Sequence, residues 1–397
     1  MESFDVIVTT DIGLENVVKK EILNILKSIR EDELIIKPFN LNGKILLKNL
    51  GYEDIIALNY KGRTFHRVYI FLGSFDVTGN KEEDFDIFYK KIKEIEFEKF
   101  INKDRTFAVD SERIDKIYDY TSIEMRAPIG QAIRDRVKDA KGFVPKVDLD
   151  SPDLLFRVEL YKRKAFVMLD TTGKKSLAKR GYRVFYHPAM LKPTIAASML
   201  IIAGWTNSMS LLDPFCGSGT IPIEAALMGR NIYPGRFRRY DFMFLKIKEF
   251  SEIYEEKIRE YEGEFIQKVN LKIYGYDKNP EYITGAKRNA MMAGVEKDVI
   301  FGIEDIRYLF FKFEGKTFDR IITNPPFGIR IKEKDLINLY YELFDTAIDL
   351  LPEDGRLVLI TPRKTLVKKI CEEKNFIIEE EYFVDYGTSH AHIFRIW

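Results

Sequence analysis

Cysteine and histidine are scarce in this chain. Its 397 residues include two cysteines and four histidines. Two cysteines, Cys216 and Cys371, exclude a disulfide framework and suit a reducing compartment. His390 and His392 form an H-x-H pair, but the sequence places no third ligand near them. We therefore expect a cytoplasmic protein with no metal site.

A strong net charge and a membrane-length apolar run are also missing. The formal net charge is +1, so a nucleic-acid surface would have to come from local clustering of basic residues. The longest apolar stretch, Ala189–Trp205, is interrupted by Lys192 and Pro193 and is too short to cross a bilayer. The start, Met1–Asp5, lacks the basic and apolar parts of a signal peptide. No membrane partner is predicted.

The second half of the chain has the rhythm of an α/β fold. After His187, strand and helix patterns alternate, which is typical of an open, mostly parallel sheet. The last two strands, Glu379–Tyr386 and Ala391–Trp397, are joined by so few residues that they must form an antiparallel hairpin. We predict a seven-stranded sheet with its reversed last strand at the edge. Its strands are expected near Leu211, Ile273, Val299, Ile321, Leu357, Glu381 and Ile393.

Asn324, Pro325, Pro326 and Phe327 form the most informative motif. They follow an apolar run, Phe318–Thr323, that predicts a buried strand. Neither proline donates a backbone hydrogen bond, and both fix φ, so the motif predicts a rigid turn. Its carbonyl oxygens and amide side chain lie beside an aromatic ring, which suits a planar base with an exocyclic amine. A plain turn is the alternative for this motif taken alone.

A glycine turn lies upstream. Leu211–Thr220 runs from an apolar strand through Gly217 and Gly219 into a helical pattern, Ile221–Leu227. The two glycines would allow a sharp turn and a close approach to a ligand. The third glycine of a dinucleotide motif and the Lys-Ser/Thr of a phosphate loop are both missing. Taken alone, Asp213 is equally well explained as a helix cap.

Two acids follow predicted strands between these motifs. The strand Ile273–Asp277 ends in Asp277, whose carboxylate could hold the hydroxyls of a ribose. Asp305 comes shortly after the strand Val299–Phe301 and could accept from the amino group of an adenine. An acid in a loop is the alternative for each residue alone, so the order of the four motifs carries the interpretation.

In this order the four motifs resemble those of Rossmann-like S-adenosylmethionine (AdoMet) methyltransferases that methylate amines. The resemblance implies AdoMet as the methyl donor and S-adenosylhomocysteine (SAH) as the product. It assigns catalysis to Asn324, Pro325, Pro326 and Phe327. The residues it assigns to the cofactor are His187, Pro188, Ala189, Leu191, Asp213, Cys216, Gly217, Ser218, Gly219, Thr220, Asp277, Asp305, Ile306 and Asn324.

A basic junction precedes the catalytic motifs. Between Arg157 and Arg183 there are nine Lys or Arg residues and two acids. The run Lys174–Arg183, followed by His187–Thr194, resembles the junction in THUMP-containing RNA methyltransferases. The resemblance implies four parts: a ferredoxin-like domain at 1–66, a THUMP RNA-binding domain at 67–170, a basic linker at 171–190 and the methyltransferase domain at 191–397.

Basic residues in two segments are candidates for RNA contact, because lysine and arginine neutralise phosphates. The alternative is a solvated linker and a charged surface loop. The candidates are Lys174, Lys175, Lys179, Arg180, Arg183, Arg236, Arg238 and Arg239.

The residues around the two prolines narrow the substrate. Asn324 before them and Gly328 after Phe327 resemble enzymes that methylate N2 of guanosine 6 in the tRNA acceptor stem. They also resemble enzymes that make N2-methylguanosine in large-subunit ribosomal RNA. Adenine-N6 or protein-glutamine methylation, and an RNA-binding protein with a vestigial site, remain alternatives. We expect a monomer that binds the tRNA acceptor end. An isolated fragment Pro188–Trp397 is expected to bind AdoMet but to lose most of its activity on tRNA.

Overall fold

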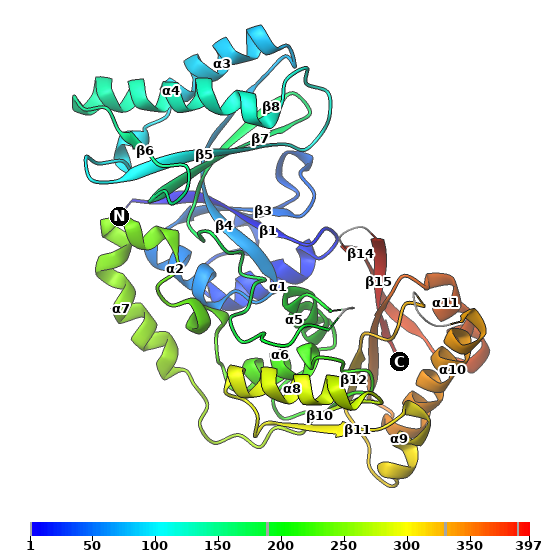
Figure 1. Ribbon diagram of the computed structural model, residues 1–397. Coiled ribbons are helices and arrows are strands. Elements are labelled where there is room, and N and C mark those ends of the chain that lie inside the picture. Colours follow the sequence, from blue (N-terminus) through cyan, green and yellow to red (C-terminus); the bar gives the residue numbers. More distant parts are fainter. Residues whose placement is uncertain (1, 188–189, 329–331, 387–388) are drawn as a thin grey trace.

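The computed structural model describes residues 2–187, 190–328, 332–386 and 389–397. Each half of the chain builds one β-sheet with helices packed on it, and the two halves lie one above the other in Figure 1. No helix among the described residues is long and apolar enough to cross a membrane.

The N-terminal half is built on an eight-stranded sheet with the order β2-β3-β1-β4-β8-β7-β5-β6. The long strand β4 pairs with β1 on one side and β8 on the other, so it joins the two predicted N-terminal units into one sheet. The strands are β1 (Phe4–Thr10), β2 (Leu34–Ile36), β3 (Lys44–Leu50), β4 (Phe65–Asp76), β5 (Thr106–Arg113), β6 (Lys146–Val147), β7 (Leu154–Tyr161) and β8 (Lys164–Asp170).

Helices α1 and α2 cover one part of this sheet, and α3 and α4 pack together on the other (Figure 1). The longest of them, α4, begins at a capping box between Thr121 and Glu124. Strand β2 ends at Ile36, because Lys37 and Phe39 adopt left-handed backbone angles around Pro38. The helices are α1 (Glu15–Ile25), α2 (Tyr52–Lys61), α3 (Lys81–Lys93) and α4 (Ser122–Lys141), with short 3₁₀ turns at Glu31–Glu33, Pro38–Asn40 and Phe97–Lys99.

The C-terminal half contains the predicted seven-stranded sheet, in the order β11-β10-β9-β12-β13-β15-β14. The first five strands in this order are parallel, and β15 is antiparallel to both its neighbours, as predicted. The predicted edge position of β15 is wrong. Its Ile393, Phe394 and Ile396 are fully buried, so it lies inside the sheet and the glutamate-rich β14 forms the edge. The strands are β9 (Leu211–Asp213), β10 (Ile273–Asp277), β11 (Val299–Ile303), β12 (Arg320–Thr323), β13 (Arg356–Thr361), β14 (Ile378–Tyr386) and β15 (Ser389–Ile396).

Helices cover both faces of this sheet. One apolar cluster joins α5, α6 and α8 to one face, and a second joins α9, α10 and α11 to the other. The helices are α5 (Pro193–Ile202), α6 (Thr220–Gly229), α7 (Lys248–Gly263), α8 (Pro280–Ala293), α9 (Ile306–Lys312), α10 (Glu333–Leu350) and α11 (Lys364–Lys374), with 3₁₀ turns at Pro234–Arg238 and Met243–Lys246.

The two halves exchange parts of their cores. Helix α7 follows α6 in the chain, yet its Phe250 and Tyr254 pack into the N-terminal core beside α2 (Figure 1). In return, Leu14 and Val17 near the start of α1 pack into the core of the C-terminal half. A fragment Pro188–Trp397 would expose these contacts to water, at about 1.5–3 kcal/mol for each large side chain. We therefore expect this fragment to be less stable than the full chain, and its AdoMet binding stays a prediction.

Candidate active site

The four predicted motifs meet at one edge of the C-terminal sheet. Strands β9 to β12 are parallel, so their carboxyl ends lie together, and these ends carry Asp213, Asp277, Asp305 and Asn324. After β9 the chain adds β10 and then β11 on one side of that strand. It then crosses over and places β12 on the other side of β9, so the strand order reverses there. A reversal of this kind leaves a crevice outside the strand ends, which is where ligands bind in open α/β sheets.

The glycine turn after β9 has the predicted sharp geometry. Gly217 and Gly219 have φ angles of 51° and 80°, in the left-handed region that favours glycine. The Gly217 N–H donates to a carboxylate oxygen of Asp277 over 3.1 Å. A Cβ on Gly219 would lie 2.9 Å from the ring of Phe301. The turn is therefore held against β10 and β11, and α6 begins directly after it at Thr220.

Asp277 lies where a ribose acceptor is predicted. Its other oxygen accepts from the N–H of Asn279 over 2.9 Å, and burial raises the pKa of the carboxyl group. The His187 ring contacts the Tyr282 ring edge-on, with centroids 4.2 Å apart, and lies beside Gly217. Sequence reasoning missed Tyr282. Its only signal was its position on the helix that follows Asp277.

Other predicted cofactor residues occupy buried positions. Asp213 accepts from the Thr323 hydroxyl over 2.7 Å and from the Phe215 N–H over 3.2 Å, and burial raises its pKa to about 7. It therefore ties the end of β9 to the residue before Asn324. Cys216 is also buried, which raises the pKa of its thiol. Leu191 and Ser218 are buried as well. Pro188 and Ala189, two further predicted cofactor residues, lie outside the described residues.

Asp305 already has a strong partner. Its carboxylate caps α9 and forms a two-pronged ion pair with Arg307, with N–O distances of 2.9 and 2.8 Å. This pair holds the pKa of Asp305 below its usual value. An adenine amine would share the remaining lone pairs of this carboxylate beside Ile306, whose side chain is buried.

The Asn-Pro-Pro-Phe turn is held from behind. The Tyr340 hydroxyl of α10 donates to the Pro326 carbonyl over 3.3 Å. Arg363, just before α11, donates through Nε to the Phe327 carbonyl over 3.3 Å. Its two terminal nitrogens are held by Glu333, at 3.3 and 3.1 Å.

The Asn324 side chain has an unmet hydrogen bond. Its Oδ1 is buried and accepts from no donor among the described residues. A buried acceptor without a donor destabilises a protein by about 1–3 kcal/mol. The two stiff prolines and the donors behind the turn keep this oxygen in place. The turn therefore fits a ligand that brings an N–H group to Asn324.

Four predicted RNA-contact residues form an open surface, called the basic surface below. Lys174, Lys175, Lys179 and Arg236 are exposed and form no ion pair within the described part of the chain. Arg238 connects the two segments from beneath, because its terminal nitrogens donate to the carbonyls of Lys175 and Thr172 over 2.7 and 2.8 Å.

Arg180 and Arg238 have structural positions, which corrects their predicted RNA contact. Arg180 is buried, pairs with Glu224 at 3.2 Å and donates to the carbonyl of Arg63 over 2.7 Å. A buried guanidinium committed to such partners cannot neutralise a phosphate. Arg239 is part-exposed and paired with two glutamates, and Nε and Nη2 of Arg183 are buried. Arg183 and Arg239 are therefore weaker candidates for RNA contact than the four residues of the basic surface.

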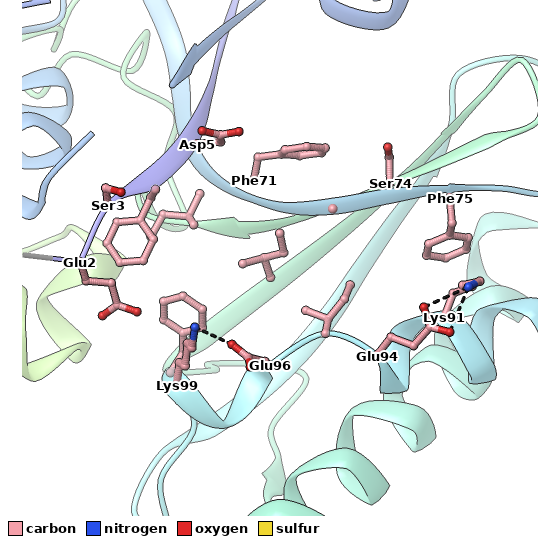
Figure 2. A pocket seen from close by; sticks show the side chains of 16 residues that line it. Glu2, Ser3, Asp5, Phe71, Ser74, Phe75, Lys91, Glu94, Glu96 and Lys99 are labelled. Carbon is pink, nitrogen blue, oxygen red and sulfur yellow. Dashed lines mark hydrogen bonds and ion pairs between the residues drawn. The ribbon is translucent and has the colours of Figure 1, made fainter. Parts of the chain in front are cut away.

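A cavity of about 650 Å³ lies on the N-terminal half, between β1, β4 and the end of α3 (Figure 2). Its lining includes Lys91 and Lys99, and each pairs with a neighbouring glutamate. Two more acids, Glu2 and Asp5, leave carboxylates in excess, so the cavity does not suit a polyanion. No group of residues in the described ranges could hold a metal ion.

The sheet, its glycine turn and its Asn-Pro-Pro-Phe turn define a Rossmann-like methyltransferase. Comparison with known families agrees: residues 180–392 match the RMKL-like methyltransferase domain, and residues 82–170 match the THUMP domain. The chain belongs to the RMKL-like methyltransferase family, with a THUMP domain before its methyltransferase domain.

Individual relatives match most or nearly all of the chain. A tRNA (guanine(6)-N2)-methyltransferase from Methanocaldococcus jannaschii is 36% identical over 399 residues, covering 99% of both proteins. A ribosomal RNA large subunit methyltransferase K/L from Buchnera aphidicola is 30% identical over 86% of this chain, but over only 48% of its own length. The solved structure of SMU.472 complexed with SAH shares the fold, with a TM-score of 0.84 at 24% identity and coverage of 100% and 98%.

Proposed function

We propose that this protein transfers a methyl group from AdoMet to the exocyclic N2 amine of a guanosine in tRNA. The observation that carries the proposal is the buried Asn324 Oδ1, which has no donor among the described residues. An amine with two N–H groups supplies that donor. The relative from Methanocaldococcus jannaschii, similar over its full length, bears the name of this activity.

The residues of the site act by positioning. AdoMet, when bound, supplies a methyl group activated by a sulfonium. Asp277 would accept from the ribose hydroxyls, and the turn at Gly217 would admit the methionine end. Asn324 Oδ1 and the Pro325 carbonyl would accept from the N2 amine, and Phe327 would stack on the guanine after it leaves the helix. Two acceptors direct the nitrogen lone pair toward the methyl group, and the proton can leave after transfer.

The finer assignment is guanosine 6 of the acceptor stem. It rests on the Asn324 motif and on the printed activity of the Methanocaldococcus relative. A tRNA substrate would place the protein in the cytoplasm. We expect it to act as a monomer, with a mass in solution near 46.5 kDa.

The test is methyl transfer to defined RNAs, read by mass spectrometry of the nucleosides. The full chain is incubated with labelled AdoMet and a tRNA transcript that carries guanosine or inosine at position 6. Inosine differs from guanosine only by lacking the N2 amine. We expect N2-methylguanosine from the first RNA and no product from the second. Equal labelling of both, or methylated adenine, would overturn the proposal.

Large-subunit ribosomal RNA is the second candidate substrate, because the Buchnera relative is named for it. An rRNA transcript in the same assay separates the two. Preference for tRNA by kcat/KM supports the first assignment, and preference for rRNA supports the second.

Removing the charges of the basic surface should weaken RNA binding with a salt signature. We expect the combined alanine variant of Lys174, Lys175, Lys179 and Arg236 to bind tRNA at least tenfold more weakly at low salt. The slope of log Kd against log salt should fall by about 3, since each lost phosphate contact removes roughly 0.7–0.9. Fluorescence anisotropy over a KCl series measures both.

A double variant outside the basic surface is the control. Lys248 and Lys369 are exposed lysines on α7 and α11, and their replacement by alanine should leave the salt slope unchanged. If both variants lower the slope equally, the binding is non-specific attraction and the basic surface has no special role.

Arg363 should hold the catalytic turn in place. We expect Arg363→Ala to lower kcat about tenfold while the Kd for AdoMet changes little, because a displaced acceptor misaligns the amine. Arg356→Ala is the matched control, since Arg356 lies at the opposite end of β13 and is also ion-paired. Steady-state kinetics with tRNA distinguish the two. The same loss of kcat in both variants would mean a general loss of stability.

A further inference from the structure

Two aromatic rings are exposed at the edge of the sheet that carries the active site. Phe383 on β14 is 45% exposed, and the His390 side chain on β15 is 69% exposed. Their ring centroids are 5.1 Å apart with a 40° angle between the planes. The lower part of the same face is covered by α11, which packs on Phe394. The uncovered pair is called the aromatic platform below.

The position of the platform follows from strand direction. Strand β14 runs in the same direction as β13, because both are antiparallel to β15. The ends of β14 and β13 therefore lie at the carboxyl edge, together with Asn324. Lys364 and Lys368, on the first turns of α11, pair with Glu381 at 2.5 and 2.9 Å. Phe383 lies two residues beyond Glu381 toward that edge.

The platform is continuous with the catalytic turn. Arg363 contacts the Phe327 carbonyl, and the next residue, Lys364, reaches the face of β14 that carries Phe383. On the other side, the N–H of Asp385 donates to the carbonyl of Ile12 over 3.2 Å. The platform thus lies between the catalytic turn and a contact of β14 with the N-terminal half.

The chemistry of this surface suits RNA. Every nucleobase has a face that stacks on an aromatic ring, whatever the sequence. Lys364 and Lys368 share the carboxylate of Glu381, and Asp385 lies 3.7 Å from the His390 ring, so the charges around the rings are balanced and stacking carries the contact. A guanosine that leaves its helix also leaves its neighbours partly unstacked. An apolar protein partner would gain little from two isolated rings among charged side chains.

We propose that Phe383 and His390 form a stacking site for a nucleobase of the RNA substrate that flanks the methylated guanosine. This inference rests on the proposed function. The site would hold the flanking nucleotide while the target guanosine lies against Asn324. It contributes to RNA affinity and not to AdoMet binding.

The test combines a protein variant with an altered RNA. Phe383→Ala in the full chain should raise the Kd for tRNA about 10- to 100-fold in fluorescence anisotropy. The Kd for AdoMet and the kcat at saturating RNA should stay near wild type. Phe383→Trp should restore binding, because tryptophan keeps a stacking face. His390→Ala should show a smaller loss of the same kind.

RNAs with one abasic nucleotide identify the stacked base. If the platform holds one flanking base, an abasic site at that position raises the Kd of the wild-type protein for the RNA. The same abasic site leaves the Kd of Phe383→Ala unchanged. The control is Ile377→Ala, since Ile377 is 52% exposed just before the opposite end of β14. Its tRNA affinity should match wild type. Unchanged binding in Phe383→Ala, or additive losses at every abasic position, would overturn the inference.

The binding readout separates this inference from the proposed function. Wild-type protein that methylates tRNA, with Phe383→Ala binding it equally well, overturns the platform alone. Wild-type protein that methylates no RNA overturns the proposed function, whatever anisotropy shows for Phe383.

Discussion

Asn324→Ala should lower kcat for tRNA methylation by about two to three orders of magnitude, while the Kd for AdoMet changes less than about threefold. A positioned polar group at a reacting centre commonly contributes this much to catalysis. The buried Oδ1 of Asn324 has no donor among the described residues. Its removal therefore breaks no hydrogen bond of that oxygen within the described part of the folded protein. Single-turnover kinetics and calorimetric titration of AdoMet measure the two quantities.

Asn324→Asp is the informative companion to this variant. It keeps an oxygen acceptor in the same place, so it should retain more activity than Asn324→Ala. Circular dichroism and thermal unfolding should be close to wild type for both variants. If Asn324→Ala loses AdoMet binding and methyl transfer to the same extent, Asn324 has a structural role and the amine-accepting turn is wrongly assigned.

Asp277→Ala should weaken AdoMet binding about 100-fold or more. The variant removes the proposed ribose acceptor and also the acceptor of the Gly217 and Asn279 N–H groups. Hydrogen bonds to a charged group contribute roughly 1.5–3 kcal/mol each, so the loss of one or two is enough for this effect. Affinity for tRNA should remain within about twofold, since the variant leaves the charges of the basic surface unchanged.

The matched control for Asp277 is Asp319→Asn. Asp319 lies at the opposite edge of the same sheet and accepts from the N–H and hydroxyl of Ser210, over 2.6 and 2.7 Å. Its replacement should change thermal stability and leave the Kd for AdoMet unaltered. Equal weakening of AdoMet binding in both variants would show that any lost acid loosens the sheet.

Much of the site could be predicted from sequence because parallel strands impose their own geometry. Each motif followed an apolar strand, and the carboxyl ends of such strands meet at one edge. The meeting of Asp213, Asp277, Asp305 and Asn324 therefore required only the correct strand assignment. The hairpin was also predictable, but a short link does not say which of its strands enters the sheet. Burial of Phe394 decided that.

Partners that are distant in sequence could not be predicted. Arg180 lies in a basic run that suggests RNA contact, yet Glu224 binds it inside the protein from 44 residues away. Charge counting reveals nothing of such a pair. Arg363 supports the Phe327 carbonyl from 36 residues away, and no motif marks it. Both interactions depend on packing of helices against the sheet, which periodicity alone does not specify.

The exchange of core residues between the halves limits which domains could replace either half. Phe250 and Tyr254 of α7 lie in the core of the other half, and Leu14 makes the reciprocal contact. Recombination that joined either half to an unrelated domain would leave a cavity in its core. It would also expose the apolar side chains that normally pack into the missing half. We therefore expect neither half to fold well when it is joined to an unrelated partner domain.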